Sequence, residues 1–287
     1  MSVTGIIFAL ITAFLFGLQG AYAKKISDKI PPLIITWGAF LFSLPYLLIA
    51  LFIDGFPTIQ WPDFLWATGV SFGLNSFTFY LFYRALQQGP LSHTMPFTAF
   101  TPVFLIPVAF VMIGERPDLK GILGIICVFA GGFSIHLTPQ NVIRSFKNIM
   151  HSTGTLLMIL VSFIWSITAT AEKVAVISSS QAFYGFIICT LLSTGYLPII
   201  LKKKSVYSET IRRHGLQLSV LGFISGLMVL AQFTALKYLL VSYVISFKRA
   251  GAIVSVLIGV IFFHEKNALK NILSTLIIIL GVFLILI

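Results

Sequence analysis

Residues 239–263 read LLVSYVISFKRAGAIVSVLIGVIFF, an apolar stretch whose only charges are Lys248 and Arg249, a third to half of the way along it. About 20 apolar residues cross a bilayer, so this stretch is long enough to span one. A charge at the bilayer centre costs about 2.5–3.5 kcal/mol on insertion scales and is usually kept for function. Because no Asp or Glu lies near the middle of another apolar segment, the sequence predicts that the negative partner of this pair comes from outside the protein.

The composition of the whole chain is typical of a membrane protein. Of 287 residues, 58% are hydrophobic and 9% are charged, and the mean hydropathy is +1.02, whereas soluble domains average about 25% charged residues. The net charge of +11 comes mostly from loop Lys and Arg, which indicates orientation and contact with anionic lipid, not nucleic acid. Cys127 and Cys189 fall inside apolar segments, which favours packing over a disulfide or a metal site.

Ten apolar segments predict an all-α polytopic membrane protein with ten transmembrane helices. They cover residues 3–22, 31–53, 63–87, 90–113, 117–137, 153–173, 180–201, 215–238, 240–263 and 267–287. The first segment has no basic region before it and is long enough to span, so we expect a membrane helix there and not a cleaved signal peptide.

The two halves of the chain repeat each other, which predicts one five-helix repeat over residues 1–150 and a second over 151–287. An offset of 150 aligns Glu115 with Glu265, Ala85-Leu86 with Ala235-Leu236, Ser92 with Ser242, Leu119-Lys120 with Leu269-Lys270 and Gly131 with Gly281, and an offset of 149 aligns Phe14 with Phe163, Phe16 with Trp165 and Lys24 with Lys173. Since five is odd, the second copy enters the membrane from the opposite side. Inverted repeats around a midplane site are typical of secondary transporters.

Two sets of fragments carry a resemblance to a known family. They are RALQQGPLSHTMPFTAFTPVF, IGERPDLKGILG and AGG in the first half, and TALKYLLVSYVISFKRAGA, FFHEKNALK and LG in the second. In order and spacing they resemble the EamA-type members of the drug/metabolite transporter superfamily, over the whole chain. The ninth segment is also similar to that of triose-phosphate and nucleotide-sugar transporters, which implies contact of a Lys-Arg pair with substrate phosphate. Of that group's phosphate-binding residues only Lys248 and Arg249 carry over.

The fourth segment differs from the ninth, its counterpart, in carrying four prolines. Pro90, Pro96, Pro102 and Pro107 each free a backbone carbonyl and bend the axis, so we expect a broken or kinked fourth helix opposite a regular, charged ninth. Thr98 and Ala99 occupy the places of Lys248 and Arg249. One interpretation makes Pro96, Pro102 and Pro107 the hinge of a gate, and the alternative makes the kinks packing features.

Further polar side chains deep in the segments are candidates for a substrate site beside Lys248 and Arg249, with Lys as a point charge and Arg as a planar fork. They are Ser242, Ser246, Asn75, Gln232, Gln19, Tyr80 and Thr98. Ser242 and Ser246 share the Arg249 face of a helix. Helix-to-helix hydrogen bonds and aromatic packing are the alternatives for these residues. For Lys248 and Arg249 the alternatives are a structural buried pair satisfied by carbonyls, water or a tyrosine, and snorkelling to the membrane interface.

Three acidic residues near segment ends favour structural interpretations. Glu172 precedes Lys173 at the end of the sixth segment, which favours a local ion pair at the membrane interface over the alternative, a proton carrier. Glu115 and Glu265 each precede a helix, where a negative charge stabilises the helix N-terminus. Small-xxx-small faces predict close helix contacts at Gly69 with Gly73 and at Gly222 with Gly226.

The leading hypothesis is a secondary transporter of a small anionic metabolite, a phosphate ester or a carboxylate, that rocks its two halves about a midplane site. Export of amino acids or of neutral or cationic compounds is the second hypothesis, and a lipid-handling or regulatory membrane component is the third. No Walker-type loop and no Cys/His or Ser/His/Asp constellation is present, so the sequence predicts no cofactor, no metal and no enzyme activity.

Charge counting gives an orientation that conflicts with the family resemblance. Outside Lys248 and Arg249, thirteen Lys and Arg fall on the side of loops 1–2, 3–4, 5–6, 7–8 and 9–10, and four fall on the side of the termini: Arg116, Lys120, Lys173 and Lys237. The positive-inside rule therefore places both termini outside the cytoplasm, whereas the resemblance implies cytoplasmic termini. We expect a multi-pass protein of a prokaryotic inner membrane, with a homodimer left open.

Overall fold

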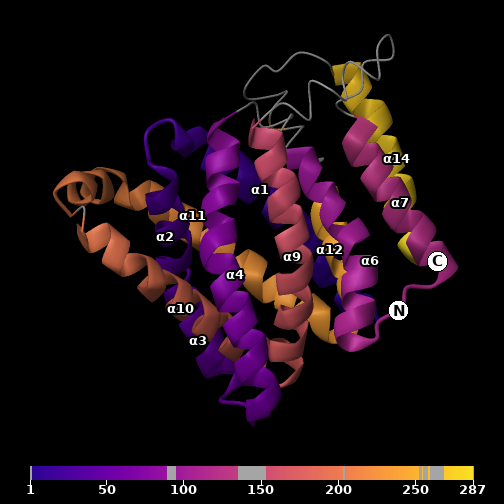
Figure 1. Ribbon diagram of the computed structural model, residues 1–287, viewed down its shortest axis with the longest axis horizontal. Coiled ribbons are helices and arrows are strands. Elements are labelled where there is room, and N and C mark those ends of the chain that lie inside the picture. Colours follow the sequence, from indigo (N-terminus) through magenta and orange to yellow (C-terminus); the bar gives the residue numbers. More distant parts are fainter. Residues whose placement is uncertain are drawn as a thin grey trace.

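A computed structural model describes residues 2–88, 95–134, 153–202, 204–251, 254, 258 and 268–286, and these residues form helices and no strand (Figure 1). The helices are α1 (Val3–Ser27), α2 (Pro32–Leu41), α3 (Leu44–Asp54), α4 (Trp61–Gln87), the 3-10 helix η1 (Met95–Ala99), α6 (Phe100–Ile113), α7 (Leu119–Ser134), α9 (Thr153–Ile177), α10 (Gln181–Lys202), α11 (Lys204–Tyr238), α12 (Val241–Ala250) and α14 (Ala268–Leu286).

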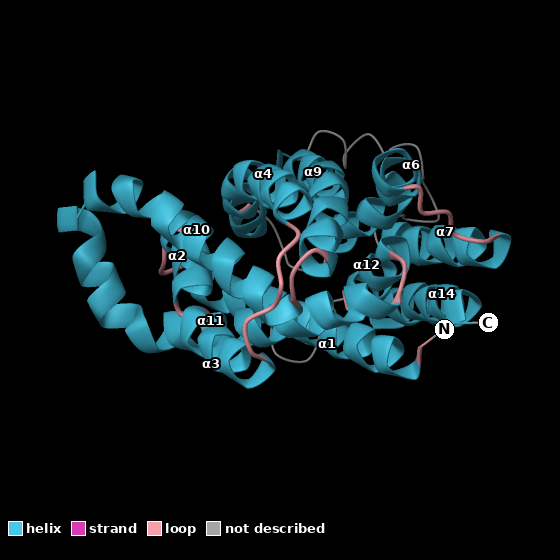
Figure 2. Ribbon diagram, turned by 90° about the horizontal axis from the view of Figure 1, so that it is seen from below, coloured by secondary structure: helices cyan, strands magenta, loops and turns pink. Residues whose placement is uncertain are grey.

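Every predicted segment contains at least one of these helices, so the prediction of an all-α membrane protein is confirmed. Five stretches are both long and apolar enough to cross a membrane: Val3–Ser27, Pro32–Asp54, Thr153–Ile177, Gln181–Lys202 and Tyr207–Tyr238. Shorter apolar helices occupy three other segments, while the number of ten crossings stays a prediction. The N- and C-termini lie beside each other at one end of the bundle (Figures 1 and 2).

The two sequence halves interleave. α1 packs against α11 and α12 of the second half, and α9 packs against α4 and α6 of the first. Figure 2 shows the result as two layers, with α4, α9 and α6 in one and α11 and α1 in the other. Because the first helix of each half is packed into the other half, rocking one intact half against the other would break both sets of contacts. The expected motion of whole halves stays a prediction.

Two of the predicted segments are broken inside. The second consists of α2 and α3, which are separated at Phe42 and Ser43, with a proline in the first turn of α3. In the fourth, η1 changes to α6 after Ala99, and Pro107 lies inside α6. The ninth segment is helical over Val241–Ala250, and most of its remainder lies outside the described residues.

Glycines bring some helices close together, but only one of the two predicted faces does so. A Cβ added to Gly222 would lie 2.6 Å from the backbone carbon of Phe42, and one added to Gly226 would lie 3.2 Å from Cβ of Ser43. The break between α2 and α3 thus packs against the face of α11 that contains Gly222 and Gly226. No described residue lies within 4 Å of a Cβ built at Gly69 or Gly73, so the prediction of a close contact there is wrong for the part of the chain that the structure describes.

Candidate functional site

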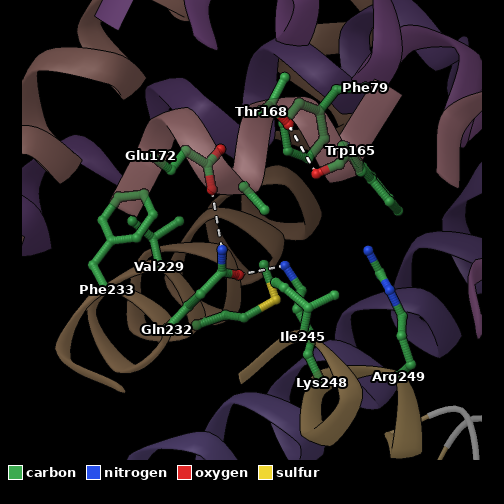
Figure 3. Close-up of a pocket in the computed structure, with 12 residues that line it drawn as sticks. Phe79, Trp165, Thr168, Glu172, Val229, Gln232, Phe233, Ile245, Lys248 and Arg249 are labelled. Carbon is green, nitrogen blue, oxygen red and sulfur yellow. Dashed lines mark hydrogen bonds between the residues drawn. The ribbon is translucent and has the colours of Figure 1, made fainter. Parts of the chain in front are cut away.

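A small cavity lies between the two layers and contains the charged pair of α12 (Figure 3). Its volume is about 50 Å³, which is room for a few water molecules. Four helices supply its lining residues: Phe79 from α4, Trp165, Thr168, Ala169 and Glu172 from α9, Met228, Val229, Gln232 and Phe233 from α11, and Ile245, Lys248 and Arg249 from α12.

Helical spacing explains which side chains reach the cavity. Trp165, Thr168 and Glu172 stand at i, i+3 and i+7 on α9, and so they share one face of that helix. Lys248 follows Ile245 by three residues on α12, and Arg249 comes next. Lys248 is 9% exposed and Arg249 is 2% exposed, so both cations are largely removed from solvent.

A chain of hydrogen bonds joins Lys248 to a carboxylate. The Nζ of Lys248 donates to Oε1 of Gln232 at 2.5 Å, and Nε2 of Gln232 donates to Oε2 of Glu172 at 3.1 Å (Figure 3). Nδ2 of Asn75 donates to the other carboxylate oxygen, Oε1, at 3.0 Å. Glu172 is therefore the acid of this cavity, held by two side-chain amides, and Gln232 is the bridge between the acid and Lys248.

Arg249 is held by aromatic rings and not by an acid. Its guanidinium carbon lies 4.9 Å from the ring centroid of Phe16 and 4.6 Å from that of Trp165, distances at which a cation is attracted to a ring face. Phe16 and Trp165 are the residues that the internal repeat pairs with each other, so equivalent positions of the two copies meet at Arg249. In the described part of the structure, Nε and Nη1 of Arg249 are buried without a hydrogen-bond partner.

Two expectations about charge are corrected by this geometry. Lys173 forms its ion pair with Glu115 and not with the adjacent Glu172, because neighbours on a helix point in different directions. Lys248 and Arg249 do share their cavity with an acid, Glu172, so the expectation that the protein offers them no carboxylate is wrong. α9 continues to Ile177, which places Glu172 inside the helix and not at its end.

A second polar cluster ties α9 and the N-terminus of α12 to the loop after α6. Besides pairing with Lys173, Glu115 accepts a hydrogen bond from the backbone N–H of Val241 at 2.9 Å, and Lys173 donates to the carbonyl of Leu239 at 2.7 Å. We call these four residues the Glu115 cluster. The prediction that Glu115 stabilises a helix N-terminus holds, but the helix is α12 and not the one that follows Glu115 in sequence.

Asp118 adds a further contact from the same loop to α12. It accepts hydrogen bonds from the hydroxyl of Tyr243 at 2.8 Å and from the backbone N–H of Gly121 at 2.9 Å. These two bonds, the Tyr243 one foremost, lower the pKa of the Asp118 carboxyl below its usual value of 3.8. The loop that joins α6 to α7 is therefore fastened to α12 at two places.

Comparison with known proteins identifies the family. The sequence model of the EamA-like transporter family matches residues 3–136 and 152–287, nearly the whole chain in two repeats. The chain belongs to the EamA-like transporter family. A solved structure titled "Crystal structure of protein" is 15% identical to this chain, with a TM-score of 0.73 over 99% of this chain and 96% of the other; at this identity the likeness shows the fold alone. No curated protein matches.

Membership of the EamA-like family confirms the resemblance drawn from the sequence. Its members are transporters and not enzymes, so the chain is an integral, multi-pass membrane protein of a family that transports small solutes. The cavity around Arg249 is lined by helices of both repeats, α4 from the first and α9, α11 and α12 from the second.

Of the other site residues predicted from the sequence, only Gln232 is among the residues that line the cavity around Arg249. Asn75 does not line the cavity but donates a hydrogen bond to Glu172, which does. Ser246 donates to the carbonyl of Ser242 within α12, and neither serine is on the cavity wall. Gln19 donates to Ser225 at 2.7 Å, and Thr98 is fully buried in η1. Tyr80 lines a separate cavity of about 430 Å³ beside Tyr196. The role of Pro96, Pro102 and Pro107 as a hinge stays a prediction.

Several residues of the site were not predicted as such, among them Glu172, Phe16 and Phe79. The repeat carries a signal for the first two. The offset of 149 that pairs Lys24 with Lys173 also pairs Ala23 with Glu172, so an acid in one copy replaces a small apolar residue in the other. Phe79 is one phenylalanine among 28, and nothing in the sequence marks it.

Proposed function

We propose that this protein is a secondary transporter that moves a small anionic metabolite, a phosphate ester or a carboxylate. The observation that carries the proposal is Arg249, a buried guanidinium held by two aromatic rings with Nε and Nη1 unpartnered. Buried N–H donors without partners are rare in proteins because each costs about 1–3 kcal/mol. A planar donor with free N–H groups suits carboxylate and phosphate oxygens. Lys248 supplies a second cation in the same cavity.

The proposal includes alternating access with the cavity occluded in the present state. The volume of about 50 Å³ is too small for most metabolites, so substrate entry requires the layers to separate. The interleaved packing favours a motion in which α4, α6 and α9 move together against α1, α11 and α12. In that scheme the Glu115 cluster, which joins α9 to α12, closes one end of the cavity.

The repeat supplies a matching closure for the other end. Glu265 and Lys24 are the repeat counterparts of Glu115 and Lys173, and Lys24 donates to the carbonyl of Leu86 at 3.0 Å, as Lys173 does to that of Leu239. Glu265 itself lies outside the described residues. In the proposed scheme, the contact of Lys24 with Leu86 and the Glu115 cluster hold opposite ends of the cavity and open in turn.

This scheme uses ten spans in two inverted repeats, residues 1–150 and 151–287, with both termini outside the cytoplasm. Its support is the pairing of repeat positions across the cavity and the excess of loop Lys and Arg on the side opposite the termini. A compartment-sensitive reporter fused to each terminus tests the orientation, and a cytoplasmic signal from both fusions would reverse it.

Binding measurements on the purified protein test the anionic substrate. We expect phosphate esters and organic acids to raise the melting temperature of the wild type and to enter proteoliposomes. The variant Arg249→Ala should lose both effects, because it removes the unpartnered donors. Arg212→Ala, which changes an exposed arginine of α11, is the matched control for loss of positive charge. Wild-type uptake by the double variant Lys248→Ala, Arg249→Ala would remove these residues from the mechanism.

One observation favours a second candidate, transport of amino acids. Glu172 lies in the same cavity as Arg249, so a molecule with an ammonium and a carboxylate could satisfy both. Amino acids that stabilise the protein, where the corresponding amine-free acids do not, would favour this candidate over the first.

A further inference from the structure

The cavity contains an unequal number of positive and negative groups. Lys248 and Arg249 face one acid, Glu172. Among the described residues, the elements packed around Glu172 add no further charge: α4 contributes Asn75 and α11 contributes Gln232, both neutral amides, and α10 contributes Tyr184 and Cys189. With Glu172 ionised, the cavity therefore carries one net positive charge. A monoanion neutralises it, whereas a dianion leaves one negative charge among charged side chains that are at most 9% exposed, where unbalanced charge is costly.

The two amides that hold Glu172 differ in whether their oxygen atom is available to accept a hydrogen bond from the protonated carboxyl group. Gln232 uses both ends of its amide, since its oxygen accepts from Lys248 and its nitrogen donates to Glu172. Asn75 uses only its nitrogen, and its Oδ1 is buried without a hydrogen-bond partner. An amide that donates to a carboxylate can turn by 180° and accept from the protonated acid. For Asn75 this turn would break no hydrogen bond of Oδ1.

We propose that Glu172 sets the charge of the anion that the cavity accepts: a monoanion binds alone, and a dianion binds together with one proton taken from solvent onto the Glu172 carboxylate. The proton then forms a hydrogen bond to Oδ1 of Asn75, and no covalent bond other than the new O–H is made or broken. This inference rests on the proposed function, because it requires that Arg249 and Lys248 bind an anion.

Two probes whose own charge does not change between pH 5.5 and 8 separate the protein's proton from that of the ligand. Methanesulfonate is a monoanion and sulfate a dianion throughout this range. We expect sulfate binding to take up one proton per protein, so that its affinity falls about tenfold for each unit of rising pH over part of the range. Methanesulfonate binding should take up none. Calorimetry in buffers of different ionisation enthalpy counts the protons.

Variants identify the group that receives the proton. Glu172→Gln should bind sulfate without proton uptake and with an affinity independent of pH, and at pH 8 the ratio of sulfate to methanesulfonate affinity should rise at least about tenfold. The control Glu209→Gln, an exposed acid of α11, should behave as the wild type. If Glu172→Gln does not fold, the proton count of the wild type with the two probes still decides.

The outcomes distinguish failure of this inference from failure of the proposed function. In one outcome, Arg249→Ala abolishes the binding of both anions, while sulfate binding to the wild type is accompanied by no proton uptake. That result overturns this inference but leaves the proposal of anion binding intact. Proton uptake that persists in Glu172→Gln also overturns it, because the receiving group is then another residue. If neither anion binds the wild type through Arg249, the anionic proposal falls and this inference falls with it.

Discussion

Replacing Glu115 by Gln tests whether the Glu115 cluster holds the two layers together. The introduced amide would keep an oxygen for the N–H of Val241 but would lose the charge that faces Lys173, whose remaining contact is the carbonyl of Leu239. The Lys173 ammonium would then stay in a poorly solvated place without a counter-charge. We expect Glu115→Gln to destabilise the protein, and Lys173→Gln to do so less, because Glu115 keeps its bond to Val241.

The exposure of the pair sets the magnitude. Removing one partner of a fully buried ion pair costs about 3–5 kcal/mol, whereas surface pairs contribute about 0–1 kcal/mol. The side chains of Lys173 and Glu115 are 11% and 13% exposed, which lies nearer the buried limit. We therefore expect Glu115→Gln to cost about 2–4 kcal/mol. At about 2–4 °C per kcal/mol, the melting temperature should fall by roughly 4–16 °C.

A thiol-reactive dye can report the unfolding. Cys189 is 1% exposed, and with Cys127 replaced by Ser it is the only thiol in the chain, so dye reaction marks the opening of the core. Glu115→Gln, Lys173→Gln and the double variant are compared in this background. Lys237→Gln is the control, since Lys237 makes only an exposed contact with Gln181 and should shift stability by less than about 1 kcal/mol.

The double variant decides the interpretation. If the pair acts as one unit, the double variant is less destabilised than the sum of the single variants by about 0.5–3 kcal/mol, because neither charge is left alone. Effects that add to within about 0.5 kcal/mol would falsify the coupling, and Glu115 would then act on α12 alone.

Three further predictions follow from the described contacts. Tyr243→Phe removes the main hydrogen bond that lowers the pKa of Asp118. A lowered carboxyl pKa stabilises the fold only while the group is ionised, so the wild type should melt at a higher temperature than Tyr243→Phe above about pH 4. Below this pH, the two melting temperatures should approach each other. Gly222→Ala should lower the melting temperature in the same dye assay because its Cβ would meet the backbone between α2 and α3, whereas Gly69→Ala, in open space, should be neutral or add up to about 1 kcal/mol. Tyr80→Phe should leave anion affinity within about twofold of the wild type, since Tyr80 lines the other cavity; a tenfold loss would place Tyr80 in the site.

The sequence predicted the helices well because their signal is local. The length of a membrane helix can be read from its run of about twenty apolar residues, and prolines and charges mark the ends of that run. The break in the second segment was missed, although Pro45 lies there, because a proline in the first turn of a helix and a proline inside one look alike in sequence. The packing of α1 into the second half was also not predictable, since it depends on the arrangement of both copies.

The candidate site was predicted in part, and the failures have one cause. Lys248 and Arg249 stand out because they are charges in an apolar segment, a property of single positions. The partners of a charge depend on which faces of which helices meet. Glu172 was assigned to Lys173, its neighbour in sequence, although a rotation of about 100° per residue separates adjacent side chains on a helix. Ser242 and Ser246 share a helix face with Arg249, but neither serine lines the cavity.

Comparison of the two copies distinguishes residues that serve packing from residues that line the cavity better than either copy does alone. Lys24 and Lys173 match in the repeat, and each donates to a backbone carbonyl near the end of a helix, Leu86 and Leu239 respectively. Where the copies differ, the second copy supplies the cavity: Ala23 corresponds to Glu172, and Thr98 to Lys248. Inverted copies need matched residues to pack alike from both sides of the membrane, whereas a solute bound on the axis between them has no such symmetry. Positions at which a buried apolar or neutral residue in one copy becomes charged in the other are therefore the places where the sequence of an inverted repeat should be searched for its substrate site.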